Sequence, residues 1–200
     1  MKTYKKNIVE EKPRLEISYD HFADNPRNWS NIGYFITCDS KYNSPDYNEE
    51  LVSLIQNTGD ESRSLDEHID KIKNEMMSKG YGKVIYITPI YKYEHGNIVY
   101  KRGTTVGFDI SNNGFYIITD KTLKEYTADK KQPINYLEEV IDSELETYTK
   151  WANGEVYCFT LYDEDGEMQD GYGDIYDLQE IKDGLPADWK DEKLEDYIIN

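Results

Sequence analysis

Residues 134–152 constrain the fold more than any other stretch, because their apolar side chains recur at helical spacing over about five turns. On a helical wheel these side chains fall in one arc, which must face a core. They are Ile134, Leu137, Val140, Ile141, Leu145, Tyr148 and Trp151. Asn153-Gly154 follows directly and ends the pattern. A helix with one long apolar face needs a second layer to pack on, and the rest of the chain has to supply it.

Short alternating or apolar runs bounded by turn residues predict that second layer as β-structure. The predicted strands are residues 15–19, 32–38, 83–93, 98–100, 104–110, 114–119 and 155–162, with a further strand returning from residue 167. Residues 94–97 close one hairpin, and Asn112-Asn113-Gly114 gives a strong tight-turn signal between two others. The acidic run 163–166 turns the last hairpin.

Helix signals are clearest at residues 64–80, where Ser64 and Glu67 form a capping box and Gly80 ends the pattern. Ser44-Pro45 predicts the start of a short helix that ends before Gly59, and further short helices are expected at 120–126 and 175–181. We therefore expect an α+β fold: a single domain over residues 14–200, mainly antiparallel sheet with two principal helices packed on it. Residues 1–13 are expected to form a flexible basic arm.

Composition supports a folded chain. Two hundred residues are enough for one buried core, and 19 Tyr with 3 Trp argue against disorder despite the charge. The tyrosines suit half-exposed sheet positions. They also suit an interaction surface, because the ring can pack while the hydroxyl stays in water.

The two cysteines, Cys38 and Cys158, and the three scattered histidines do not form a zinc pattern. No apolar run reaches the length of a membrane span, and residues 1–6 lack the apolar segment of a secretory signal. We expect a cytoplasmic protein in a reducing compartment, without cofactor, metal or membrane contact.

Negative charge is concentrated towards the C-terminus. Residues 137–200 hold 20 Asp and Glu against 4 Lys and Arg, whereas residues 1–136 hold 20 against 19. A basic footprint for nucleic acid is absent, so we expect no direct nucleic-acid binding. An acidic surface favours basic partners, although acidity also simply keeps proteins soluble.

The outer face of the 134–152 helix carries carboxylates in a sector about 100° wide, namely Glu138, Glu139, Asp142 and Glu146. Four carboxylates along about 12 Å of helix axis approach the spacing of phosphates along one DNA strand, about 3.4 Å. This face is therefore a candidate mimic of a nucleic-acid backbone. An ordinary solvated helix face gives the same pattern, and both interpretations stay open.

Glu144 differs from its neighbours because it lies inside the apolar arc. A carboxylate there must find a donor or shift its pKa upward. Pairing with a Lys or a Tyr hydroxyl is the structural interpretation. The functional one is a pocket acid, in a small-ligand site built with Tyr148 and Trp29 beside the central sheet.

The acidic turn at Asp163-Glu164-Asp165-Gly166-Glu167 does not fit a calcium loop, because the sixth and twelfth positions hold Met168 and Asp174. A β-turn explains it better, and weak divalent binding by Asp163, Asp165, Glu167 and Asp170 stays open. No residue set predicts a catalytic centre, and Gly171-Tyr172-Gly173 lacks the spacing of a phosphate loop.

Two segments resemble an uncharacterised family of small proteins from phages, plasmids and integrated elements. The first is Asn25-Pro26-Arg27-Asn28-Trp29-Ser30-Asn31-Ile32-Gly33, and the second runs from Glu144 to Tyr157 and on through the acidic turn. This chain departs from the family's Asp-Ser-Cys-Trp-Gly-like segment by carrying Asp170-Gly171-Tyr172-Gly173. The resemblance implies a mobile-element origin, and small acidic proteins of such elements often inhibit host defence.

The leading functional expectation is a non-catalytic phage or mobile-element protein that binds a basic surface on a host nucleic-acid enzyme, such as a restriction or CRISPR effector. Trp151, Tyr172 and Trp189 are the expected aromatic anchors beside the carboxylates. The alternatives are the small-ligand pocket and a structural module without a binding role. The oligomeric state stays open.

Overall fold

The computed structural model describes residues 14–128 and 131–199, and the predicted basic arm at 1–13 lies outside the described residues. The chain folds into two compact units. The central unit is Asn25–Thr149, and the terminal unit combines residues up to Asp24 with those from Lys150 onward. The predicted extent of one domain, residues 14–200, stays a prediction.

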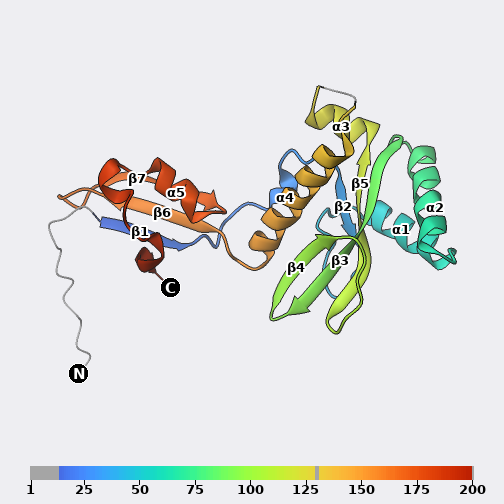
Figure 1. Ribbon diagram of the computed structural model, residues 1–200, viewed down its shortest axis with the longest axis horizontal. Coiled ribbons are helices and arrows are strands. Elements are labelled where there is room, and N and C mark those ends of the chain that lie inside the picture. Colours follow the sequence, from blue (N-terminus) through green and yellow to red (C-terminus); the bar gives the residue numbers. More distant parts are fainter. Residues whose placement is uncertain (1–13, 129–130, 200) are drawn as a thin grey trace. The chain divides into compact units, whose positions relative to one another are not determined.

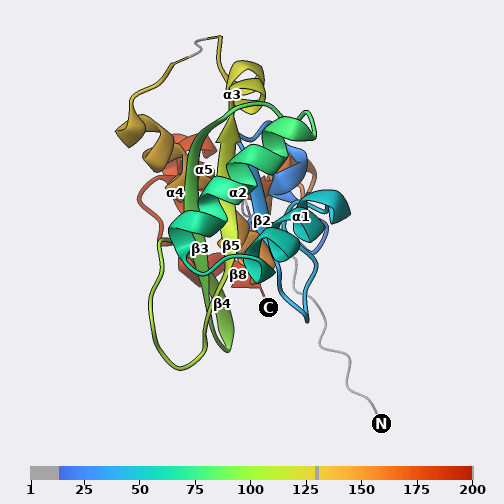
Figure 2. The same cartoon turned by 90° about the vertical axis from the view of Figure 1, so that its right-hand side faces the viewer.

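The central unit is built on an antiparallel sheet with strand order β2-β5-β3-β4. Its strands are β2 (Tyr34–Thr37), β3 (Val84–His95), β4 (Asn97–Arg102) and β5 (Ile110–Thr119). Helices α1 (Glu49–Asp60) and α2 (Leu65–Ser78) cover one face of the sheet (Figures 1 and 2). Ile55, Ile72 and Met76 form the core there with Phe115 and Ile117 of β5.

The opposite face of the same sheet carries α4 (Ile134–Ala152), which follows the short α3 (Asp120–Tyr126) (Figure 1). Leu137, Ile141 and Leu145 are buried, as the apolar arc predicts. The last turn of α4, from Lys150, belongs to the terminal unit. The α+β class is confirmed, and the two longest helices, α2 and α4, pack on the sheet as predicted.

The terminal unit has a second sheet, with strand order β7-β6-β1-β8 (Figure 1). Its strands are β1 (Arg14–Tyr19), β6 (Tyr157–Tyr162), β7 (Met168–Ile175) and β8 (Ile198–Ile199), and only β8 pairs in parallel. The chain between β7 and β8 forms α5 (Leu178–Gly184), η2 (Ala187–Trp189) and η3 (Leu194–Tyr197). Ile17 and Phe159 pack with Ile181, Leu185 and Leu194 in the core of this unit.

The predicted strand at 104–110 is wrong, because residues 103–109 form a loop and β5 begins at Ile110. Gly103 and Asp109 take positive φ angles of 101° and 64°, which an extended strand does not contain. The Asn112 side chain holds the loop by bonding both backbone groups of Thr105. The predicted tight turn at 112–114 is therefore also wrong, since these residues lie within β5.

Helix starts differ from prediction in two cases, α1 and α5. Asn48, rather than Ser44, caps α1, because its side chain accepts the Leu51 N–H, and the helix continues through Gly59 to Asp60. Ser64 caps α2 as predicted by accepting the Glu67 N–H. The predicted helix at 175–181 instead starts after Asp177, which caps α5.

Candidate functional site

The predicted acidic segment 137–200 is divided between the two units. Residues 137–149 belong to the central unit, and residues 150–200 belong to the terminal unit. The carboxylates on α4 and those on the last hairpin are therefore two separate sets, which we describe in turn.

On α4, two of the four predicted carboxylates are paired within the unit. Arg102 of β4 makes a bidentate contact to Asp142, with Nε–Oδ1 at 2.6 Å and Nη2–Oδ2 at 2.8 Å. Its Nη1 also lies 3.2 Å from the Glu138 carboxylate, which accepts a further hydrogen bond from the Tyr86 hydroxyl. Glu138 and Asp142 are therefore paired within the unit, and their contact with a partner stays a prediction. Glu139 and Glu146 are exposed.

Between α4 and the β3–β4 hairpin lies a groove of about 760 Å³, here called the α4 groove. Tyr86, Tyr91 and Tyr100 contribute its aromatic wall. Glu138, Asp142 and Glu146, one helical turn apart, contribute its acidic wall, and Lys101 and Arg102 contribute the positive charges. This volume lies within the range of ordinary ligand sites.

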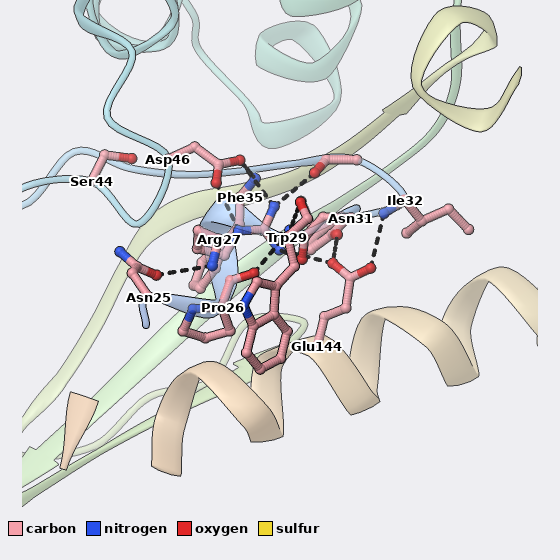
Figure 3. Close-up of polar contacts among 12 residues, drawn as sticks. Asn25, Pro26, Arg27, Trp29, Asn31, Ile32, Phe35, Ser44, Asp46 and Glu144 are labelled. Atoms are coloured by element: carbon pink, nitrogen blue, oxygen red, sulfur yellow. Dashed lines mark hydrogen bonds and ion pairs between the residues drawn. The ribbon is translucent and has the colours of Figure 1, made fainter. Parts of the chain in front are cut away.

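The Glu144 carboxylate accepts hydrogen bonds from three donors (Figure 3). Its Oε2 lies 2.8 Å from Arg27 Nη1 and also accepts the Tyr116 hydroxyl, while Oε1 accepts the Ile32 N–H at 2.9 Å. The predicted need for a donor is confirmed, and the donors are an arginine, a tyrosine and a backbone amide. These satisfied bonds give Glu144 a structural role.

Arg27 is the centre of this network, and only 3% of its side chain is exposed. Besides Glu144, its guanidinium donates to Asp46 at 2.7 and 3.0 Å and to Asn31 Oδ1 at 2.8 Å. The fifth donor reaches the Gly33 carbonyl at 2.7 Å. All five guanidinium donors are therefore used, which is the condition for burying such a charge.

Both segments of the family resemblance contribute to this Arg27 network. Asn25 caps the 3-10 helix η1 (Pro26–Asn28) by accepting the Arg27 N–H, and Asn31 donates to the Pro26 and Trp29 carbonyls (Figure 3). Gly33 has no room for a side chain, since a Cβ there would lie 2.4 Å from the Ile117 carbonyl oxygen. The residue types of these two segments thus fix a fold element.

Two groups of the network, Arg27 and Tyr116, have raised pKa values. Burial by itself lowers the pKa of Arg27, yet the contacts to Asp46 and Glu144 outweigh it and raise that pKa above its usual value. Burial also raises the pKa of Tyr116 well above its usual value, so its hydroxyl stays protonated and donates to Glu144.

The predicted pocket of Trp29, Glu144 and Tyr148 stays a prediction. A hollow of about 510 Å³ lies beside Trp29, and its walls include Asn28, Tyr34 and Tyr47 but neither Glu144 nor Tyr148. Tyr148 is buried against the Phe35 ring, with centroids 5.5 Å apart. The hollow beside Trp29 therefore does not bring these three residues together.

A second hollow, of about 460 Å³, brings together Cys38 and His68. Burial raises the pKa of the Cys38 thiol to about 11, and its Sγ contacts the Val52 carbonyl. The His68 Nε2 lies 2.9 Å from the Ile55 carbonyl. The thiol is thus far from the thiolate form that nucleophilic catalysis uses.

In the terminal unit, β6, β7 and the turn between them form the acidic hairpin, residues 157–175. Its carboxylates lie in the turn and on β7. Asp163 Oδ1 accepts the N–H groups of Asp165 and Glu167 at 3.0 and 2.9 Å, which confirms a side-chain-stabilised turn. Asp165, Glu167 and Asp170 are exposed. Within residues 14–128 and 131–199 no group of His, Cys, Asp or Glu has the arrangement of a metal site.

The predicted aromatic anchors differ in exposure. Tyr172 on β7 is 46% exposed, although its ring edge packs on Phe159. Trp151 donates its indole N–H to the Ala23 carbonyl at 3.1 Å. Trp189 packs against the core of its unit and against Tyr197. Trp151 and Trp189 thus take part in packing, and Tyr172 is the anchor with the more open side chain.

The charge of the terminal unit cannot be balanced internally. Over residues 1–24 and 150–200 this unit holds 20 Asp and Glu against 9 Lys and Arg. Even if every base of the unit paired with a different carboxylate, 11 carboxylates would be left over without a base from the same unit. Arg14 and Glu16 form one such pair at 3.1 Å.

Arg27, Asp46, Tyr116 and Arg102 were not predicted as site residues from the sequence. Of these four residues, only Arg27 could have been singled out from the sequence, because it lies within the first segment that resembles the mobile-element family. No helix among the described residues is long and apolar enough to cross a bilayer. No protein-family model, curated protein or solved structure matches this chain.

Proposed function

We propose that the protein is a non-catalytic binding protein whose terminal unit docks on a basic surface of a nucleic-acid-handling protein. The observation that carries this proposal is the excess of 11 carboxylates over bases in that unit. Like charges on a compact unit repel each other, and a basic partner relieves that repulsion. Such a surface also speeds encounter with a basic partner and excludes anions, including nucleic acid.

The acidic hairpin is the part of this surface that we expect to contact the partner first. Its turn presents Asp165 and Glu167 as exposed groups, and Asp163 fixes the backbone that carries them. Tyr172, on the same hairpin, adds a partly exposed ring of the kind that anchors interfaces. A fixed hairpin loses little conformational entropy on binding.

The resemblance to mobile-element proteins directs the choice of partner. A protein of a phage or plasmid gains from blocking host enzymes that cut foreign nucleic acid, and these enzymes hold DNA or RNA in positively charged channels. The proposed partner is therefore a restriction or CRISPR effector. Occupation of the channel by the terminal unit would compete directly with the nucleic acid.

Affinity capture from a lysate of the organism that carries the gene tests this function. The intact chain is immobilised at low salt, and bound proteins are eluted with a salt gradient. We expect a basic nucleic-acid-handling enzyme that elutes early and whose retention is blocked by added DNA or RNA. A matched column carries Asp163→Asn, Asp165→Asn, Glu167→Gln and Asp170→Asn together. Equal retention on both columns, or retention that added nucleic acid leaves unchanged, contradicts the proposal.

A further inference from the structure

Arg102 shows what kind of group the α4 groove accommodates. Its guanidinium lies against the acidic wall, with two bonds to Asp142 and a third contact to Glu138. Asp142 therefore already has the bidentate geometry in which a carboxylate binds arginine. The Arg102 guanidinium is therefore an example, within the groove itself, of the kind of group that the acidic wall binds.

The acidic wall extends beyond the reach of this one arginine. Glu138, Asp142 and Glu146 follow each other at four-residue spacing, about 6 Å of helix axis per step. Arg102 contacts the first two, and the exposed Glu146 lines the groove one turn further on. Three carboxylates against Lys101 and Arg102 leave the groove with a net negative charge.

The groove also has an aromatic wall, and the Tyr86 hydroxyl on it donates to Glu138. Tyr86 and Tyr91 line the groove, and guanidinium groups stack on such rings while pairing with carboxylates. A phosphate or a free carboxylate would meet repulsion from three acids here. A cationic side chain meets attraction from both walls, and arginine uses the rings better than lysine does.

We propose that the α4 groove binds an arginine side chain of the basic partner, between the Tyr86–Tyr91 wall and the carboxylates of Asp142 and Glu146. This inference rests on the proposed function, and it adds a specific pocket in the central unit to the general charge attraction of the terminal unit. Arg102 is then an internal competitor for the same carboxylates.

The test uses a capped pentapeptide, Gly-Ser-Arg-Ser-Gly, titrated into isotopically labelled intact protein and followed by NMR. Matched peptides carry lysine or uncharged citrulline in place of arginine. We expect saturable shifts at Tyr91, Arg102 and Glu146, weaker binding of the lysine peptide, and none of the citrulline peptide. Shifts confined to the acidic hairpin would overturn the groove proposal and leave the proposed function standing. Equal binding of the citrulline peptide would also overturn it.

Single substitutions test whether each charged residue strengthens or weakens binding of the arginine peptide. Glu146→Gln should weaken arginine-peptide binding about two- to fivefold. The control is Glu75→Gln on α2, which removes the same charge outside the groove and should leave binding unchanged. Arg102→Gln should tighten binding at least about threefold, because it releases Asp142. Thermal unfolding checks that each variant is folded. An equal loss in Glu139→Gln and Glu146→Gln would assign binding to the overall helix charge and overturn the proposal.

Discussion

Arg27 and Glu144 are 117 residues apart in the chain, and their side chains meet at 2.8 Å between Nη1 and Oε2. The pair joins the loop before β2 to the middle of α4, across one face of the central sheet. Because Asp46 and Tyr116 complete the network, neither charge is left without a partner. The contact therefore fixes where α4 lies, and with it the position of the α4 groove.

Replacing Arg27 by lysine should cost about 3–5 kcal/mol of unfolding free energy. Lysine supplies fewer donors and no planar fork, so buried acceptors among Asp46, Asn31 and Glu144 lose their bonds. Urea unfolding followed by circular dichroism measures the difference. Arg14→Lys, at a side chain that is 60% exposed, is the control and should change stability by less than about 0.5 kcal/mol. Equal stability of the two variants would contradict the account of this network.

Gly33→Ala should destabilise the central unit by about 1–3 kcal/mol or more. The added Cβ would lie 2.4 Å from the Ile117 carbonyl oxygen, and a backbone atom in the sheet cannot move away cheaply. Gly107→Ala is the matched control, because its Cβ meets only the Ile110 side chain, at 3.2 Å. Thermal unfolding of both variants checks this, and a larger loss in the control would contradict it.

The secondary structure was largely predictable, and its failures have local causes. The bounds of α4 follow from a strong helical period that ends at Asn153-Gly154. In contrast, Val106, Phe108 and Ile110 alternate like a strand, although Gly103 and Asp109 turn the backbone out of the sheet. Backbone angles at single residues override a periodicity of only a few positions.

The sites were less predictable, because their contacts join distant parts of the chain. A helical wheel shows that Glu144 needs a donor, but it cannot identify Arg27, which lies in η1, 117 residues away. The same wheel places Asp142 on the outer face, and only the sheet register brings Arg102 of β4 to it. Charge counts therefore predicted acidic surfaces without the internal pairs that neutralise part of them.

Cys38 should resist alkylation at pH 8 in the folded protein. Burial raises the pKa of its thiol to about 11, so only about one thiol in a thousand is ionised at that pH. Iodoacetamide labelling followed by peptide mass spectrometry measures the rate at this residue. In urea the same thiol should react at the rate of a model peptide. Fast labelling of the folded protein would contradict the raised pKa of this half-buried thiol.

The Asp39–Lys92 pair should stabilise the central unit at neutral pH and lose its effect in acid. Despite burial, the Lys92 contact lowers the pKa of Asp39 below its usual value, so the stabilisation is present above about pH 3.9 and is lost as pH falls through the folded value. Asp39→Asn should cost about 1.5–3 kcal/mol at pH 7. Urea unfolding of both proteins at pH 7 and pH 3 tests this, and an equal difference at the two values would contradict it.

The same pair also predicts an alkaline limit. Burial disfavours the charge on Lys92, yet Asp39 and Glu94 outweigh it and raise the pKa of Lys92. The stabilisation is therefore complete below about pH 10.4 and is lost as pH rises through the folded value. Stability measured from pH 9 to pH 12 should fall less steeply in Asp39→Asn than in the native chain. Parallel curves would show that Lys92 gains nothing from Asp39.

The salt dependence of partner binding tests the central claim most directly. Isothermal titration of the intact chain against the purified captured enzyme, from 50 to 500 mM salt, measures it. Exposed charges are screened within about 8 Å at physiological ionic strength, so we predict an affinity loss of at least about tenfold over this range. The variant with Asp163, Asp165, Glu167 and Asp170 neutralised should bind more weakly and with a smaller slope. An affinity that stays constant across the salt range would contradict docking through the acidic surface.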